Sequence, residues 1–365
     1  MPKTPGTWDY VIVGAGTAGC LLANRLSADP DMRVLLLEAG GEDDWIWIHI
    51  PVGYLYCIGN PRTDWCYRTE PEPGLNGRSI LYARGKVLGG CSSINAMVYM
   101  RGQARDYDEW RSLGNPGWGW DDVLPVFKRT EDHHLGTDAM HGSGGEWRVE
   151  RQRLSWEILD AFRDAMAEAG IPKIPDFNRG DNEGSGLFEV NQKRGVRWNA
   201  SKAFLRPAMR RPNLTVITHA QVRRLRMDGR RAAGVEFFRG NEESFAGARI
   251  ETILAAGAIG SPQILQLSGV GDPEHLANRL AGRARTARRR KKHAGLLCRA
   301  CLLPGRASAP APGRCGRCRA AMSRPSRTGR ATCPRSTRAT CRKRATGAPS
   351  LAACGLRGGC LTRRR

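Results

Sequence analysis

The pattern of apolar and polar residues near the start of the chain predicts a strand, a helix and a second strand. The apolar run Tyr10 to Val13 is bounded by glycine, as in a buried parallel strand. The next segment carries three leucines at helical spacing, Leu21, Leu22 and Leu26. Asp29-Pro30 ends this predicted helix, and "RVLLLEAG" (33–40) is a second apolar run. The pattern indicates a βαβ unit.

Two further stretches extend the prediction. Residues 154–171 place apolar residues on one face of an amphipathic helix, namely Leu154, Ile158, Leu159, Phe162, Met166 and Ala169. The stretch 212–238 alternates apolar and polar residues as two strands, a turn at Asp228-Gly229 and a third strand. An α/β protein with a mainly parallel sheet is expected.

A glycine motif lies between the first strand and the first helix. Gly14, Gly16 and Gly19 form GxGxxG, in which the glycines permit a tight turn, the approach of a pyrophosphate and close helix–strand packing. Glu38 ends the second strand, where a carboxylate accepts hydrogen bonds from both hydroxyls of an adenosine ribose and disfavours a 2′-phosphate. The motif predicts a dinucleotide site and leaves NAD and FAD open.

Charge divides the chain in two. Residues 1–280 carry 34 Lys plus Arg and 35 Asp plus Glu, whereas residues 281–365 carry 24 Lys plus Arg and no acidic residue. The formal charge of +23 therefore comes from the last 85 residues. Eight of the twelve cysteines also lie there, and the other four are too scattered to form a disulfide framework.

No targeting signal is expected in the first residues. Met1 to Trp8 lacks the basic start and apolar core of a signal peptide, and no apolar run reaches the roughly 18 residues needed to span a bilayer. We expect a cytoplasmic protein without a transmembrane segment.

A second glycine-rich stretch favours FAD over NAD as the dinucleotide. "RGKVLGGCSSINAMVYMRG" (84–102) and "GAIGSPQILQLSGVG" (257–271) resemble the two signatures of the glucose–methanol–choline (GMC) flavin oxidoreductases. "HGSGGEWRV" (141–149), "NASKAFLRP" (199–207) and "RPNLTVITHAQVRRL" (211–225) match as well. The resemblance runs from Trp8 to Leu280 and implies FAD.

The resemblance also implies where FAD binds. The first glycine turn, with Thr17 and Ala18, would hold the pyrophosphate, and Glu38 the ribose. Val222 would meet the adenine through its backbone. The residues expected beside the isoalloxazine are Val87, Gly90, Asn95, Ala96, Met97, Val98, Ala256 and Gly257.

Three further features are expected to have no catalytic or metal-binding role. Some relatives bond the flavin covalently through a histidine in the second loop, and because this sequence has Ile94 there we expect non-covalent FAD. Cys91 has no histidine near it in sequence and is expected to be a small packed residue rather than a nucleophile. His133 and His134 are expected to be a solvated pair in a loop, and no metal site is predicted.

The implied reaction is oxidation of a primary alcohol, choline-like or other, to an aldehyde. A base near pKa 7 takes the hydroxyl proton while a hydride goes to flavin N5. In the resembled family a histidine near the C-terminus is this base. None of the seven histidines of this chain occupies such a motif, so no catalytic residue is assigned. Oxygen and a quinone both stay open as electron acceptor.

The basic tail admits two interpretations. Read one base out of frame, Arg285 to Leu296 can encode a sequence containing "LPGVGKNMQD", which resembles a GMC element expected shortly after the second signature. A frameshift would thus make 281–365 a non-native, unstructured tail and remove the GMC C-terminal catalytic domain. The alternative is a zinc or nucleic-acid module built on Cys298-x2-Cys301 and Cys315-x2-Cys318, which the strand-free composition disfavours.

The sequence therefore predicts a Rossmann-like FAD-binding region over residues 1–280, with inserted substrate-side α+β segments within about 131–214. The chain as written is predicted to be inactive. A small-molecule alcohol is the expected partner of the intact form, and nucleic acid is not favoured.

Overall fold

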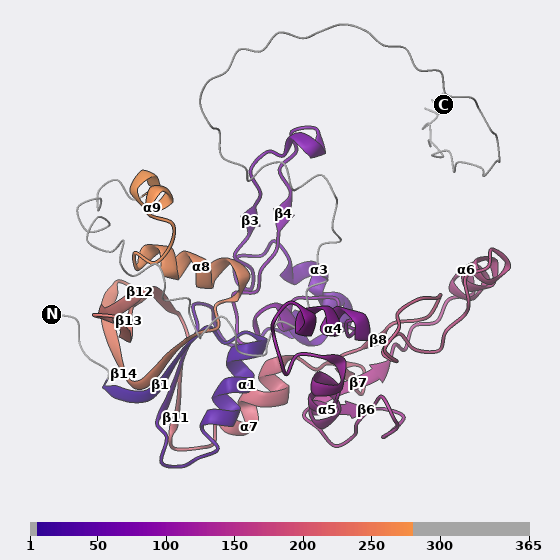
Figure 1. The fold of residues 1–365 in the computed structure, drawn as a ribbon, viewed down its shortest axis with the longest axis horizontal. Helices are drawn as coiled ribbons and strands as arrows, with labels where there is room; N and C mark the ends of the chain where they lie inside the picture. Colours follow the sequence, from indigo (N-terminus) through magenta and orange to yellow (C-terminus); the bar gives the residue numbers. More distant parts are fainter. Residues whose placement is uncertain (1–5, 280–365) are drawn as a thin grey trace, which may run out of the picture. The chain divides into compact units, whose positions relative to one another are not determined.

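The largest sheet of the described residues has six strands (Figure 1). The computed structural model describes residues 6–279, so the predictions for residues 281–365 lie outside the described part. The strands lie in the order β11-β2-β1-β14-β13-β12. Their bounds are β1 Thr7–Val13, β2 Val34–Leu37, β11 Leu214–Ile217, β12 Ala220–Asp228, β13 Arg231–Arg239 and β14 Glu242–Leu254.

The four strands β11, β2, β1 and β14 are parallel, and β12 and β13 add an antiparallel edge. The two predicted strands at the start of the chain are β1 and β2. The three strands predicted over 212–238 are β11, β12 and β13, with the turn between Asp228 and Arg231. The predicted α/β class and mainly parallel sheet are confirmed.

Alternate residues of the central strands face two different apolar layers. Ile12 and Leu36 pack on one face with α1 (Thr17–Leu26) and with the turn Ser201–Leu205 that leads into α7 (Arg206–Ala208). Val11 and Leu35 pack on the other face with residues of β12, β13 and α8 (Gly257–Leu267). Because both faces are covered, the strands are continuously apolar, as parallel strands commonly are.

A smaller sheet is formed in the order β5-β8-β7-β6. Its strands are β5 Val98–Tyr99, β6 Glu131–His133, β7 Trp147–Arg151 and β8 Glu189–Val190. The helices α4 (Ala104–Ser112) and α5 (Trp120–Thr130) precede β6, and α6 (Glu157–Glu168) lies between β7 and β8. This is the α+β region expected within about 131–214, and its role on the substrate side stays a prediction.

Shorter elements complete the described part. They are α2 Ile46–His49, α3 Tyr54–Cys57, β3 Tyr67–Arg68, β4 Leu81–Tyr82, β9 Gln192–Lys193, β10 Val196–Arg197, α9 Pro273–Arg279 and the 3-10 turns Pro51–Gly53, Pro73–Leu75 and Gly90–Ser93. The β3–β4 hairpin projects from the body of the fold (Figure 1).

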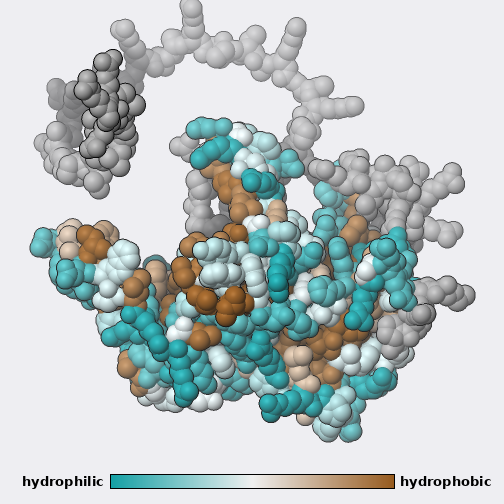
Figure 2. Space-filling view, turned by 180° about the vertical axis from the view of Figure 1, so that it is seen from behind, coloured by the Kyte–Doolittle hydropathy of each residue, from teal (hydrophilic) through white to brown (hydrophobic). Residues whose placement is uncertain are grey.

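The amphipathic helix predicted over 154–171 is shorter than expected and its apolar face is open. It is α6, which begins at Glu157, and Ile158 and Phe162 are 66% and 61% exposed. Leu55 of α3 and Tyr82 of β4 are exposed as well. Apolar surface is visible on the hairpin and on the arm that carries α6 (Figure 2). No helix of the described residues is long and apolar enough to cross a membrane.

The central layer predicts the effect of one core substitution. Leu36→Ala removes a fully buried side chain from the middle of the sheet and leaves a cavity, so the free energy of unfolding should fall by about 2–5 kcal/mol. Urea denaturation followed by circular dichroism measures this. The matched control is Leu154→Ala, which truncates a side chain that is 65% exposed. It should change stability by less than about 0.5 kcal/mol, and equal effects would contradict the assigned core.

Candidate functional site

The carboxyl ends of the parallel strands meet at one edge of the large sheet, and the glycine motif turns there. The N–H of Gly14 donates to the Leu37 carbonyl at 2.7 Å, and that of Ala255 donates to the Val13 carbonyl at 2.8 Å. The ends of β1, β2 and β14 are thereby fixed side by side. Such an edge is where open α/β sheets bind their ligands.

The three glycines of the motif have three different environments. Gly14 has φ +96°, and a Cβ there would lie 2.7 Å from the carbonyl oxygen of Ala255. A Cβ on Gly19 would lie 1.9 Å from the Gly14 carbonyl oxygen, so helix and turn pack backbone to backbone. A Cβ on Gly16 would come no nearer than 4.0 Å to the Ala255 oxygen. Gly16 thus faces open space, as a residue beside a ligand must.

The first turn of α1 is left free to bind an anion. Thr17 and Ala18 begin the helix after Gly16, no side chain caps its N-terminus, and its first turn contains no acidic residue. The first N–H groups of a helix lack intrahelical acceptors, and the helix dipole favours negative charge near them. A diphosphate is the kind of group that this arrangement accepts.

Glu38 lies beside the glycine turn. Its side chain is 6% exposed, and its two oxygens accept hydrogen bonds from the N–H groups of Ala15 at 2.7 Å and Gly40 at 2.8 Å. Burial raises the pKa of this carboxyl, and the backbone hydrogen bonds oppose the rise. Each carboxylate oxygen retains a lone pair for a hydroxyl of a bound ribose.

The second glycine-rich stretch docks directly onto the first. The N–H of Gly89 donates to the Ala15 carbonyl at 2.8 Å, and a Cβ on Gly90 would lie 2.7 Å from the Cα of Gly16. Residues far apart in the sequence therefore form one continuous surface. Asn95, Ala96 and Val98 are exposed on it, whereas Val87 and Met97 are buried.

The other predicted contacts lie around the same edge. Ala256 and the exposed Gly257 begin α8 directly after β14, and Val222 lies on β12. The N–H of Ala220 donates to the Glu38 carbonyl at 2.8 Å, which brings the start of β12 to the predicted ribose position. The assignment of these residues to FAD stays a prediction.

The expectation for Cys91 is wrong in one respect. The residue belongs to the tight 3-10 turn Gly90–Ser93, but its side chain is exposed rather than packed. Its Sγ accepts a hydrogen bond from the Gly85 N–H at 3.4 Å. The loop doubles back onto Gly85, where a Cβ would lie 2.7 Å from the Cys91 nitrogen.

The expectation of a solvated histidine pair is also wrong. His133 is part of β6 and only 5% exposed, and His134 is half-buried. Their Nε2 atoms lie 2.9 and 3.0 Å from Oε1 of Glu189 on β8, so both donate to the same carboxylate oxygen. Sequence reasoning missed this cluster because Glu189 is 55 residues away from His134 and becomes a neighbour only through sheet pairing.

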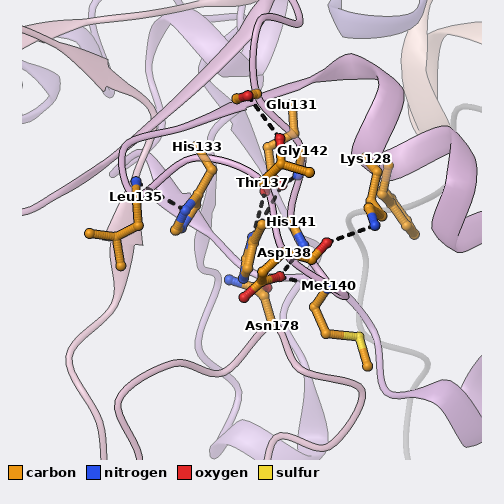
Figure 3. A network of polar contacts seen from close by, with 12 residues as sticks. Lys128, Glu131, His133, Leu135, Thr137, Asp138, Met140, His141, Gly142 and Asn178 are labelled. Atoms are coloured by element: carbon orange, nitrogen blue, oxygen red, sulfur yellow. Dashed lines mark hydrogen bonds and ion pairs between the residues drawn. The ribbon is translucent and has the colours of Figure 1, made fainter.

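A third histidine of the cluster, His141, is held between the carboxylates of Glu131 and Asp176; Figure 3 labels His141 and Glu131. Nδ1 of His141 lies 3.1 Å from Glu131 Oε2, and Nε2 lies 2.8 Å from Asp176 Oδ2. Burial opposes the charge of His141, but the hydrogen bonds to Asp176 and Glu131 outweigh it and raise the pKa to about 9. Arg101 pairs with Glu131 at 2.8 Å. The imidazolium and the guanidinium therefore neutralise the buried acids.

The ligand atoms of His133, His134 and Glu189 lie within 4.8 Å of one another, which is the one such grouping among the described residues. Two observations favour hydrogen bonding over a metal ion here. The Leu135 N–H points at Nδ1 of His133 at 3.4 Å, so the ring proton sits on Nε2, where a metal would bind. The charged ring of His141 also stacks on His133 with centroids 3.9 Å apart and would repel a cation.

Comparison with known proteins identifies the family of this site. The model of the GMC oxidoreductase family matches residues 8–284, which include both glycine-rich loops, Glu38 and α8. The chain belongs to the GMC oxidoreductase family. The predicted family is thereby confirmed.

Three similar proteins illustrate the match. Human mitochondrial choline dehydrogenase is 42% identical over 277 residues, which are 74% of this chain and 46% of that protein. The crystal structure of pyridoxine 4-oxidase from Mesorbium loti has a TM-score of 0.71 and 40% identity, and the match covers 74% of this chain and 53% of that one. An FAD-dependent oxidoreductase from Chaetomium thermophilum has a TM-score of 0.69 and 32% identity, and the match covers 75% of this chain and 49% of that one.

The chain spans about half the length of the curated relatives it matches. The cofactor of the GMC family is FAD, and the described edge fits it. The uncapped start of α1, the open side of Gly16 and the carboxylate of Glu38 supply what a pyrophosphate and an adenosine ribose require.

The histidine cluster predicts a pH-dependent stability. The folded-state pKa of His141 lies above its ordinary value of 6.5, so its stabilisation is complete below about pH 6.5 and is lost as the pH rises through about 9. Between pH 6.5 and 10 the free energy of unfolding should fall more steeply for wild type than for His141→Gln, by at most about 3 kcal/mol. Urea denaturation at each pH measures the free energy of unfolding of both proteins. His275→Gln, at an exposed histidine, should follow the wild type. Parallel curves for wild type and His141→Gln would contradict the assignment.

Proposed function

We propose that this chain binds FAD non-covalently at the carboxyl edge of the large sheet. The observation that carries the proposal is the docking of the 85–95 loop onto the first glycine turn through Gly89 and Ala15. It creates an open surface that is flanked by a helix N-terminus and a buried carboxylate. Ile94 supports a non-covalent link, because it has no nucleophilic atom and its side chain is buried beside Val87.

The family resemblance and this geometry together support the following proposed residue roles. The N–H groups of the first turn of α1 bind the pyrophosphate, with Gly16 leaving room for it, and Glu38 accepts hydrogen bonds from the ribose. Val222 meets the adenine through its backbone. Gly90, Asn95, Ala96 and Val98 line the flavin side together with Ala256 and Gly257, and the buried Val87 and Met97 support that surface from beneath.

We propose oxidation of a primary alcohol as the reaction of the intact family member. FAD, when bound, supplies the hydride acceptor. The similarity to choline dehydrogenases supports a choline-like substrate. The acceptor that reoxidises the flavin is proposed only as a class, oxygen or a quinone. The base that takes the hydroxyl proton is not assigned to any residue of this chain, because none of its seven histidines occupies the expected motif.

The proposal is tested by purifying the full chain with FAD. Flavin should co-purify and should remain in the supernatant after acid precipitation of the protein. Flavin in the protein pellet would contradict the non-covalent link, and a chain without flavin that gains none on titration would contradict the site. With FAD bound, addition of choline should not reduce a dye acceptor, and steady reduction would show that the chain carries a base that the motifs missed.

Gly16 allows a sharper test of the site. Gly16→Val adds a side chain on the open side of the turn, where it should exclude the pyrophosphate without disturbing the protein packing. FAD affinity should fall at least about tenfold, which is 1.4 kcal/mol. The urea midpoint of the apoprotein should stay within error of the wild type. Gly74→Val is the control, since a Cβ on Gly74 meets nothing within 4 Å and Gly74 lies on the hairpin turn, away from the glycine motif. Equal FAD binding by both variants would place the cofactor elsewhere.

A further inference from the structure

Arg197 of β10 is a buried cation without a carboxylate partner. Its side chain is wholly buried, and all of its described hydrogen bonds go to neutral oxygens. Nε donates to the Ile48 carbonyl at 2.7 Å, and Nη1 donates to the Ser92 carbonyl at 3.1 Å. Nη2 has no partner among the described residues. Burial lowers the pKa of this guanidinium to about 10, so it stays charged at neutral pH.

Nη1 of Arg197 also donates to Oδ1 of Asn95 at 2.9 Å. The same oxygen accepts a hydrogen bond from the Met97 N–H at 3.1 Å. Both partners are donors only, so the oxygen of the amide must face them and the NH2 group must face away. Asn95 is exposed, and no described residue accepts a hydrogen bond from its Nδ2. The amide therefore presents two N–H donors outward.

The residues that follow Arg197 also form hydrogen bonds with the second glycine-rich loop. Oγ of Ser92 accepts a hydrogen bond from the Ala200 N–H at 2.9 Å, and Oγ of Ser93 accepts one from Nδ2 of Asn199 at 2.8 Å. These bonds fix the loop backbone. Among the bonds from this segment, the one from Arg197 reaches the side chain of Asn95, and together with the bond from the Met97 N–H it fixes the orientation of that amide.

We propose that Arg197 is a positioning residue for the cofactor, which holds Asn95 so that its NH2 group donates to an acceptor atom of bound FAD. The inference rests on the proposed FAD site. The guanidinium strengthens the donor character of the amide because a hydrogen bond to a charged group polarises its partner. Removing Arg197 leaves no buried carboxylate unpaired, since none contacts it.

The test is a double-mutant cycle on the FAD affinity of the full chain. The affinity is measured by titrating the apoprotein with FAD and recording FAD fluorescence. Arg197→Met and Asn95→Ala should each weaken binding by about tenfold, and the double variant should bind no more weakly than Asn95→Ala alone. Independent, multiplying effects, or wild-type affinity of Arg197→Met, would overturn the inference. Failure of the wild type itself to bind FAD would instead overturn the proposed function.

Two further variants separate positioning from packing. Arg197→Lys fills nearly the same space as Arg197→Met but keeps a donor for Asn95, so it should recover part of the lost affinity; identical affinities of the two would overturn the inference. Arg211→Met is the matched control, because Arg211 also bonds neutral oxygens, those of Asn24 and Ser27, and lies away from the loop. It should bind FAD as the wild type does.

Asn95→Asp keeps the test decisive if the Arg197 variants do not fold. The new carboxylate still accepts from Arg197 and Met97, so the urea midpoint of the apoprotein should not fall. It presents an oxygen where the amide presented its NH2 group, so FAD affinity should fall below that of Asn95→Ala. Wild-type affinity of Asn95→Asp would show that the outward group is not a donor to FAD, and would overturn the inference.

Discussion

The site depends on one close approach of two backbones, the first glycine turn and the 85–95 loop. Gly90 contacts Gly16 where no Cβ would fit on Gly90, and Gly89 donates to Ala15. Backbone groups that bond each other at this distance leave no room for side chains. The two segments therefore meet backbone to backbone at this point. The sheet beneath, with its two apolar layers, keeps both segments in place.

The buried charges around Glu131 and the buried charge of Arg197 have different kinds of partner. In the small-sheet region, Arg101 and His141 pair with Glu131 and Asp176, so residues of the chain itself neutralise these two carboxylates. Breaking one of these pairs would leave a buried charge unpaired, which is costly. Arg197 is the opposite case, because the chain offers it only neutral oxygens. Its positive charge therefore acts on the neutral groups that it contacts, among them the side chain of Asn95.

Short-range patterns predicted much of this arrangement. The βαβ unit, the antiparallel edge and the α6 helix follow from local periodicity, and the glycines of the first turn follow from steric limits that act on consecutive residues. The mistakes concern Cys91, His133 and His134, whose burial depends on what packs over them. The hydrogen bonds of Glu189 to the histidines cross the small sheet, and Arg197 reaches Asn95 across about a hundred residues of sequence. No local signal marks such pairs.

The sequence by itself determined the family and the cofactor class, because these rest on contiguous motifs whose backbone geometry is set by glycine. Only the tertiary structure decided which way the Asn95 amide points, which histidine is charged and which apolar faces stay uncovered. These properties arise from electrostatics and packing between segments that are distant in the chain. A hydrogen bond of 3 Å between such segments depends on the whole fold that brings them together.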